Sequence, residues 1–425
     1  MRRPKVLIIG AGFGGLEVAR GLSRSEAELT ILDRENHHCF QPLLYQVATA
    51  ALSPADIAWP IRGLLGKAAN TTVLMTEATR IDAENGRVFA GKREFPYDFL
   101  VLATGVTHSY FGNDHWANWA PGLKHIEDAT EIRRRLLTSF ELAEITSCDD
   151  ERRRLTTFVV IGGGPTGVEM AGAISELARH ALPRDFRHVD PEKSRIILIE
   201  AGPRILSGYP EDLSRYAQNS LEKMGVEIIT GAPVSDCNEA GVSIGSRHIG
   251  AGAVVWAAGV RASSLAGTMG AKCDKSGRVK VESDLSVPGY PNVFAIGDVA
   301  AVQQDGKPVP GIAPAAKQMG QHVTAVIKRR LAGDDRRQSF HYRHQGDLAT
   351  IGRKAAVVKL KNIELRGFIG WIFWGVVHVY FLMGGRNRAV VGLNWLWNYM
   401  TFQRSARLIT MEPTPRETKT DQEVA

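Results

Sequence analysis

The chain has 425 residues, more than one domain usually holds, and 44% of them are hydrophobic, so two or three folded domains are expected rather than a disordered protein. The formal charge of +7 is compatible with an anionic membrane surface, whereas no nucleic-acid-binding module is recognisable. The cysteines form no C-x-x-C pair and so indicate neither a disulfide scaffold nor a metal site; they are Cys39, Cys148, Cys237 and Cys273.

The first elements of the chain predict a β-α-β unit. Residues 5–10 (KVLIIG) are a short apolar run typical of a buried parallel strand, residues 14–24 predict a helix, and residues 28–33 (ELTILD) predict the next strand. A G-x-G-x-x-G turn joins the first strand to the helix, where free N–H groups favour a pyrophosphate, and the acid ending the second strand can accept the ribose hydroxyls. The unit therefore predicts a bound dinucleotide held by Gly10, Gly12, Gly14, Gly15 and Asp33.

The same order of elements recurs later in the chain. Residues 97–105 (YDFLVLATG) predict a strand that ends in a turn containing Thr104 and Gly105, and residues 127–145 predict a linking helix. The repeat begins with a strand at 155–164 and a helix at 167–179. A strand at 195–200 and a last strand at 252–259, which ends in AAG, follow. The chain is therefore predicted to contain a duplicated dinucleotide-binding domain.

The second glycine turn predicts a second nucleotide. Its residues are Gly162, Gly164, Pro165 and Gly167 after one strand, Ala258 and Gly259 after another, and Glu200 as the acidic partner. The carboxylate repels a 2′-phosphate, which favours NADH over NADPH, although Arg204 lies near enough to weaken that preference. Two nucleotides in one chain indicate a resident flavin and a transient nicotinamide that meet at the domain interface.

A later segment returns to the first domain. Residues 291–300 (PNVFAIGDVA) predict a strand, a turn and the start of a helix, without a counterpart in the second half. We therefore expect an α/β protein with two Rossmann-like domains and a C-terminal membrane-docking segment. The predicted boundaries are 1–120 with 270–340 for the discontinuous first domain, 121–269 for the second, 341–410 for a strand region with aromatic helices, and 411–425 for a disordered tail.

These motifs together resemble the two-dinucleotide-binding flavoproteins and, among them, the type II NADH dehydrogenases, which are single-subunit NADH:quinone oxidoreductases. The resemblance runs from Lys5 to about Ile409; besides the glycine turns it is carried by FQPLLYQVATA (40–50), ATG (103–105), AIGDVA (295–300), APAAKQMG (313–320) and the aromatic tail. It implies a respiratory-chain enzyme that does not pump protons. Such an enzyme holds FAD non-covalently, accepts a hydride from NADH at flavin N5 and passes two electrons to ubiquinone or menaquinone.

The resemblance also implies roles for single residues. Asp298, after Gly297, would bind the FAD ribityl chain, although a helix-capping role is compatible with its position. Ala315 and Ala316 would begin a helix whose N–H groups face the flavin pyrimidine edge. Pro314 stands where the family has the first glutamine of A-Q-x-A-x-Q, so quinone contacts are expected to differ there.

Two residues are candidates for the chemistry itself. Glu169 would lie near nicotinamide and flavin, to handle a proton or orient the nicotinamide amide; the alternative is a first-turn glutamate stabilised by the helix dipole. Gln318 would line the quinone pocket; the alternative is an amide that caps a loop. Proton-relay candidates with weaker support are His37, His38 and His378.

The C-terminal segment predicts contact with a membrane. Residues 367–385 carry no formal charge, and aromatic side chains with flanking arginines suit the headgroup boundary. We expect monotopic attachment at the cytoplasmic face of the plasma membrane; a single span and a buried core or dimer helix are the alternatives. The oligomeric state stays open, a homodimer included.

Two other functions fit parts of the pattern. A sulfide:quinone reductase shares the architecture but needs reactive cysteines beside the flavin, and only Cys39 lies near the expected flavin motifs. A non-catalytic NADH sensor with a vestigial flavin would keep both glycine turns and lose quinone reduction.

Overall fold

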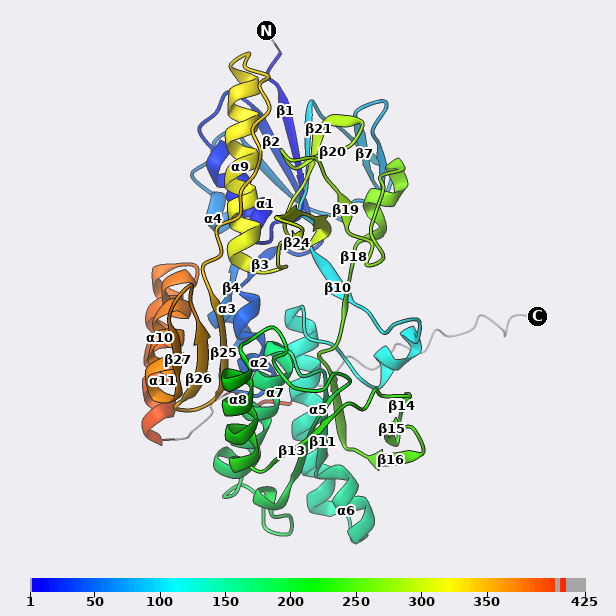
Figure 1. Cartoon of the computed structure of the whole chain (residues 1–425), viewed down its shortest axis with the longest axis vertical. Helices are drawn as coiled ribbons and strands as arrows, with labels where there is room; N and C mark the ends of the chain where they lie inside the picture. Colours follow the sequence, from blue (N-terminus) through cyan, green and yellow to red (C-terminus); the bar gives the residue numbers. More distant parts are fainter. Residues whose placement is uncertain (1, 402–405, 410–425) are drawn as a thin grey trace, which may run out of the picture.

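The computed structural model describes residues 2–401 and 406–409, apart from the side chains of residues 398–400. The predicted tail at 411–425 lies outside the described residues. Two α/β domains follow one another along the long axis of the molecule, and the C-terminal helices lie at one side where the domains meet (Figure 1).

The first domain is built on a six-stranded sheet in the order β20-β21-β9-β1-β2-β5. All neighbours in it are parallel except β20 and β21. Its strands are β1 Lys5–Ile9, β2 Glu28–Asp33, β5 Thr71–Met75, β9 Phe99–Leu102, β20 Ser286–Val287 and β21 Tyr290–Ala295. Their apolar side chains are buried on both faces of the sheet, as parallel strands require. Because β21 pairs with β9, the first domain is discontinuous, as predicted.

The second domain repeats this plan with a four-stranded parallel sheet in the order β13-β12-β11-β17. The order matches β5-β2-β1-β9 of the first sheet, which confirms the duplicated architecture. The strands are β11 Thr157–Ile161, β12 Arg195–Glu200, β13 Val226–Thr230 and β17 Ala253–Trp256. The long helices of the two domains are α1 Phe13–Leu22, α5 Ile126–Ile145, α7 Pro165–Glu176, α8 Glu211–Lys223 and α9 Ala313–Leu331.

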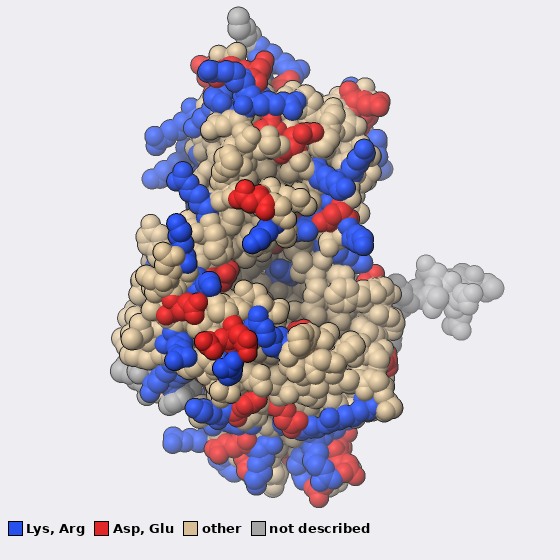
Figure 2. Space-filling model, in the orientation of Figure 1, with Lys and Arg blue, Asp and Glu red and all other residues tan. Residues whose placement is uncertain are grey.

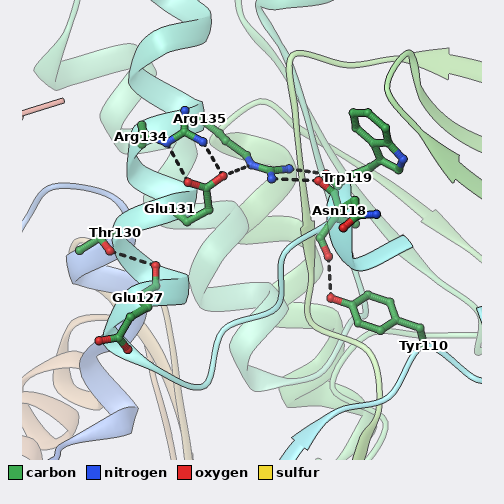
Figure 3. A network of polar contacts seen from close by, with 9 residues as sticks. Tyr110, Asn118, Trp119, Glu127, Thr130, Glu131, Arg134 and Arg135 are labelled. Atoms are coloured by element: carbon green, nitrogen blue, oxygen red, sulfur yellow. Dashed lines mark hydrogen bonds and ion pairs between the residues drawn. The ribbon is translucent and has the colours of Figure 1, made fainter. Parts of the chain in front are cut away.

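An antiparallel pair of short strands, β10 Val106–His108 and β18 Val260–Ala262, joins the domains. The segment after β10 is held to α5 by Arg135. This guanidinium binds Glu131 at 2.5 Å and donates to the carbonyls of Asn118 and Trp119, each at 2.9 Å (Figure 3). The connector is therefore fixed to the second domain.

The C-terminal region contains a small sheet and two helices: β25 Asp347–Gly352, β26 Ala355–Lys359, β27 Glu364–Arg366, α10 Gly367–Phe381 and α11 Gly385–Thr401. The predicted strand region contains a hairpin, because the chain reverses after Gly352, with Lys354 at φ 70°. The helix predicted to start at the end of 291–300 is absent. A single 3₁₀ turn at Gly297–Val299 follows β21, and the helix begins only at Ala313. Within the described chain, no helix has the length and apolarity needed to cross a bilayer.

Shorter elements complete the fold. They are α2 Leu44–Ala48, α3 Pro54–Ile57, α4 Ile61–Leu65, α6 Asp149–Leu155, β3 His37–Cys39, β4 Ala58–Pro60, β6 Arg80–Asp82, β7 Arg87–Ala90, β8 Arg93–Pro96, β14 Asp236–Asn238, β15 Gly241–Ile244, β16 Arg247–Gly250, β19 Val279–Lys280, β22 Ala300–Ala301, β23 Gln303–Gln304 and β24 Lys307–Pro308.

Candidate active site

A large cleft of about 1440 Å³ lies between the two domains and the C-terminal helices. The molecule is visibly hollowed at mid-height in the space-filling view (Figure 2). Most of the predicted flavin residues line this cleft, together with one residue of the predicted NADH set, Pro165, and both catalytic candidates, Glu169 and Gln318. The flavin residues are Gly10, Gly12, Gly14, Asp33, Thr104, Gly105, Gly297, Asp298 and Ala316. Residues far apart in the sequence therefore meet where a flavin and its substrates were expected.

The two glycine turns are built alike at the atomic level. Asp33 accepts hydrogen bonds from the backbone N–H of Ala11 at 2.6 Å and of Glu35 at 2.8 Å. Glu200 accepts the equivalent pair, from Gly163 at 2.5 Å and Gly202 at 2.6 Å. In both domains the acid at the end of the second strand fixes the turn after the first strand, which orients that turn for a pyrophosphate.

Several glycines in these turns are required by the fold itself. A Cβ on Gly15 would lie 1.9 Å from the carbonyl oxygen of Gly10, and one on Gly167 would lie 1.8 Å from that of Gly162. Gly10 and Gly162 have φ of 97° and 110°, which other residues rarely adopt. These four glycines allow the tight turn and the close packing of helix on strand.

The middle glycines of the turns differ from the others. Gly12 and Gly164 have ordinary negative φ, −66° and −72°. A Cβ on either would meet no described atom within 4 Å. The fold therefore does not need glycine at these positions, whereas a phosphate lying against the backbone there does. Both turns fit a dinucleotide by this test.

Three predicted flavin residues have packing roles that the sequence did not reveal. A Cβ on Gly14 would lie 3.0 Å from the Ile296 side chain, so this glycine lets α1 approach its neighbours closely. Ala315 is fully buried and does not line the cleft. The N–H of Ala316 already donates to the Ile312 carbonyl at 3.1 Å, so it is not a free donor for the flavin.

Glu169 lies on the first turns of α7, where the second domain faces the cleft. Burial raises the pKa of its carboxyl to about 8, and among the described residues the N–H of Thr350 is its one recorded hydrogen-bond donor, at 3.4 Å. A carboxyl with that pKa is mostly protonated at neutral pH and can give up its proton.

Gln318 lies at the start of α9, between the cleft and the segment before β25. It lines the cleft, and its side-chain amide pairs with the backbone of Arg343, accepting from the N–H and donating to the carbonyl, each at 2.9 Å. The amide therefore holds the segment before β25 against α9. The neighbouring Lys317 also lines the cleft and lies 5.1 Å from the ring centre of Phe381 on α10.

Two histidines face the cleft in a neutral form. The Nδ1–H of His38 donates to the Ala11 carbonyl at 2.9 Å, and that of His378 donates to the Trp374 carbonyl at 2.7 Å. Burial lowers the pKa of each imidazole to about 4. Both remain uncharged at neutral pH, so they can accept hydrogen bonds at Nε2 but are poor proton donors. His37 lies at the half-exposed rim, beside Asn36.

The rest of the NADH set lies outside the cleft lining, around the carboxyl edge of the second sheet. Glu200 is held there as described, and Ala258 and Gly259 follow β17. Arg204, which could have favoured a 2′-phosphate, donates to the carbonyls of Leu206, Ser207 and Tyr209 at 2.8–3.3 Å. Its guanidinium is therefore engaged within the loop, which leaves the Glu200 carboxylate to decide the coenzyme.

Known proteins match the chain over almost its full length. The model of the pyridine nucleotide-disulphide oxidoreductase family matches residues 4–320, and that of the NDH2 C-terminal domain matches residues 344–404. The type II NADH:quinone oxidoreductase Ndh of Mycobacterium tuberculosis is 42% identical, with 99% of this chain and 93% of that protein covered. The chain belongs to the type II NADH:quinone oxidoreductases.

Solved structures agree with this family in their fold. The Plasmodium falciparum NDH2 in complex with NADH matches the enzyme with a TM-score of 0.88 at 20% identity, covering 96% of the enzyme and all of that chain. The sulfide:quinone oxidoreductase of Aquifex aeolicus matches with a TM-score of 0.74 at 19% identity, covering 91% and 92% of the two chains. At these identities the likeness concerns the fold alone.

The cysteines of the enzyme do not support sulfide chemistry. Cys39 lies in the cleft, but burial raises the pKa of its thiol to about 12, so it stays protonated. Among the described residues that line the cleft, Cys39 is the one cysteine. It therefore has no second cysteine there with which to form a disulfide.

Replacement of Glu200 by glutamine is expected to weaken the preference of the enzyme for NADH over NADPH by about tenfold. The amide oxygen still accepts from one turn N–H, while the charge that repels a 2′-phosphate is lost. Steady-state kcat/KM values with both coenzymes measure the change. Glu211→Gln, on the exposed start of α8, is the control and should leave the ratio as it is.

The sequence did not reveal several residues around Glu169. Tyr209, Asp347 and Thr350 come from other parts of the chain, so no local pattern points to them. Glu176 is different: it lies seven residues after Glu169 on α7, a spacing that places both acids on one face of the helix.

Proposed function

We propose that the enzyme oxidises NADH through FAD in the large cleft and passes two electrons to a quinone that enters from the membrane, without pumping protons. The observation that carries this proposal is the pair of like-built dinucleotide turns beside one cleft whose third wall is the aromatic helix α10.

The first domain fits FAD. Gly12 leaves room for the pyrophosphate, Asp33 lies where the ribose hydroxyls are expected, and Asp298, half-buried in the cleft, is available to the ribityl chain. FAD supplies the redox chemistry when bound: its N5 accepts the hydride and the reduced ring gives two electrons to the acceptor. Gly164 and Glu200 offer the corresponding places for NADH.

The quinone path is supported by the three faces of α10. Phe373, Val377 and Phe381 line the cleft, and Trp374 packs into the protein. The adjoining face is exposed and apolar, and it carries Ile369, Ile372, Val376 and Tyr380. The cleft lining and the proposed bilayer surface thus lie side by side on one short helix, so a lipid-soluble acceptor can reach the site from the membrane.

The function is tested with purified protein, NADH and soluble analogues of ubiquinone and menaquinone. We expect a yellow protein that oxidises NADH rapidly with a quinone present. Bleaching of the flavin without turnover would indicate a sensor, and quinone reduction that depends on sulfide would indicate a sulfide oxidase. The better analogue identifies the quinone class.

The outer faces of α10 and α11 are expected to hold the enzyme on membranes. Ile369 is 67% and Leu393 66% exposed, and Trp397 is also exposed. Ile369→Glu combined with Leu393→Glu should lower the liposome-bound fraction at least about tenfold, because each change removes apolar area and adds a charge near lipid. Flotation with vesicles measures binding.

A matched control is available far from these helices. Ile145, at the end of α5, is 80% exposed, and Ile145→Glu should leave vesicle binding unchanged. Equal losses in the control and in the double variant would refute docking through α10 and α11. Attachment at the cytoplasmic face, the quinone class and a homodimer stay predictions.

A further inference from the structure

Phe111 lies on the connector between the two domains, in a turn that does not favour its residue type. The N–H of Asn113 donates to the carbonyl of Tyr110 at 3.0 Å, and the two residues between them, Phe111 and Gly112, have φ of 53° and 95°. Positive φ at both central positions is typical of a type I′ turn, which prefers Asn, Asp or Gly there and strains a bulky side chain. The glycine meets this requirement, whereas the phenylalanine does not.

The side chain of Phe111 is also exposed to solvent. At 70%, it is more exposed than any other Phe, Trp or Tyr side chain that the structure describes. Its neighbours on the connector, Tyr110 and Trp116, are buried and pack with Trp256 at ring-centre distances of 5.0 and 5.8 Å. The Phe111 ring lies at the outer edge of this cluster, 6.2 Å from that of Trp256. A strained backbone that carries an exposed ring indicates a role in binding rather than in folding.

The Phe111 ring covers a turn that the first domain leaves open. Gly105 after β9 and Gly259 after β17 hold equivalent places in the duplicated domains, with φ of 63° and 81°. A Cβ on Gly105 would meet no described atom within 4 Å, and this glycine lines the cleft. A Cβ on Gly259 would lie 2.5 Å from the Phe111 ring. The second domain thus has an aromatic side chain at the place where the first domain has open space beside its nucleotide site.

The strand order places this ring beside one half of the coenzyme. In the second sheet β12 lies on one side of β11 and β17 on the other. A dinucleotide bound across the carboxyl edge of such a sheet has its pyrophosphate at the turn after β11, here at Gly164, and its two halves over the neighbouring strands. Glu200 at the end of β12 marks the adenosine side, so the end of β17 lies on the nicotinamide side. Arg261, two residues after Gly259, lines the cleft in which the nicotinamide must meet the flavin.

We propose that Phe111 binds the nicotinamide half of NADH, with its exposed ring lying against the nicotinamide nucleoside where the coenzyme enters the cleft. An aromatic ring offers a large, rigid apolar face, which suits the carbon-bearing face of a ribose and the flat nicotinamide ring. Binding covers apolar area that water otherwise surrounds, which favours the complex. This inference rests on the proposed function, because it assigns a contact to the NADH that the second domain is proposed to hold.

Two substitutions separate the contact of Phe111 with the coenzyme from its place in the turn. Phe111→Asn removes the ring and supplies a residue that a type I′ turn prefers, so its melting temperature should equal or exceed that of the wild type. Phe111→Tyr keeps the ring. Trp119→Leu is the control, because this side chain is also exposed on the connector and the carbonyl that Arg135 binds is retained. Flavin absorbance verifies that each variant keeps its cofactor.

Binding is measured without turnover, by calorimetric titration of the FAD-loaded enzyme with NAD⁺ and with ADP, which has the adenosine and pyrophosphate but no nicotinamide nucleoside. We expect Phe111→Asn to raise the Kd of NAD⁺ about tenfold, the effect of one aromatic contact, and to leave the Kd of ADP unchanged. The KM for NADH, with the soluble one-electron acceptor ferricyanide, should rise by a similar factor at unchanged kcat. Phe111→Tyr and Trp119→Leu should behave as the wild type.

An unchanged Kd of NAD⁺ in a folded Phe111→Asn protein would overturn the proposal and show that the ring merely covers Trp256. Equal losses of NAD⁺ and ADP affinity would overturn it too, because the ring would then act on the adenosine side or through the shape of the connector. Phe111→Gly, which the turn also accepts, takes the place of Phe111→Asn if that protein does not fold. A wild-type enzyme that binds neither NAD⁺ nor ADP and does not oxidise NADH would instead refute the proposed function.

Discussion

Replacement of Glu169 by glutamine is expected to slow NADH:quinone turnover about a hundredfold near neutral pH, the loss typical of a removed general acid. Glutamine keeps the size and hydrogen-bonding capacity of the side chain but has no acidic proton. The matched control is Glu17→Gln, since Glu17 holds the equivalent place on α1, two residues after Gly15, and binds only the Gln321 amide, at 2.9 Å, within the described chain. Steady-state kcat with a quinone analogue measures both.

The pH dependence of quinone turnover is a second measurement of the role predicted for Glu169. Burial raises the pKa of Glu169 from 4.5 to about 8, so the wild-type rate should hold at neutral pH and fall as pH rises through about 8. Folding stability follows the same group. The folded protein favours the protonated carboxyl, so wild-type stability declines as pH rises from about 4.5 towards 8, whereas the glutamine variant lacks this decline. An unchanged pH profile in Glu169→Gln would contradict the assignment.

Gly12→Ala is expected to weaken binding of FAD and Gly164→Ala binding of NADH, and both variants should keep the fold intact. The added methyl group meets no described atom in either position but occupies the space of a pyrophosphate. Overpacking of this kind costs about 2 kcal/mol, or roughly thirtyfold in affinity. Gly12→Ala should therefore lose FAD on dilution, and Gly164→Ala should stay yellow with a raised KM for NADH.

The controls are the third glycines of the same turns. Gly15→Ala and Gly167→Ala force a Cβ against a backbone oxygen, so their melting temperatures should fall even when the cofactor is in excess. Flavin absorbance after gel filtration and thermal melting distinguish the two classes. A Gly12→Ala protein that melts early without losing FAD affinity would show that this glycine serves the fold and not the ligand.

Much of this fold follows from local sequence patterns. Strands such as KVLII and TFVVI are buried on both faces and are therefore apolar along their length. Each ends at a glycine turn, and an acidic residue at the end of the next strand accepts hydrogen bonds from that turn. These patterns correctly predicted the duplicated order and the return of the segment 291–300, through β21, to the first sheet. The roles of Asp33 and Glu200 stay predictions. The domain boundaries themselves stay predictions.

Other features depend on contacts that no local pattern contains. The hairpin at Gly352 has no Asn-Gly or proline signal, and the alternation of side chains continues on both sides of the turn. Pro314 fits the first turn of α9, so the helix starts early and the N–H of Ala316 is already bonded. The surroundings of Glu169 are assembled from several separate elements, so only Glu176, on the same helix face as Glu169, was open to inference.

The discontinuity of the first domain has a consequence for synthesis of the protein. The edge of β9 stays unpaired on the ribosome until β21 has emerged, after the entire second domain has been translated. An open, apolar strand edge invites pairing with other chains, and such long-range closure is slow. The nascent N-terminal part is thus the segment of the polypeptide most in need of chaperone protection, and a transcript cut short before residue 290 encodes an aggregation-prone product.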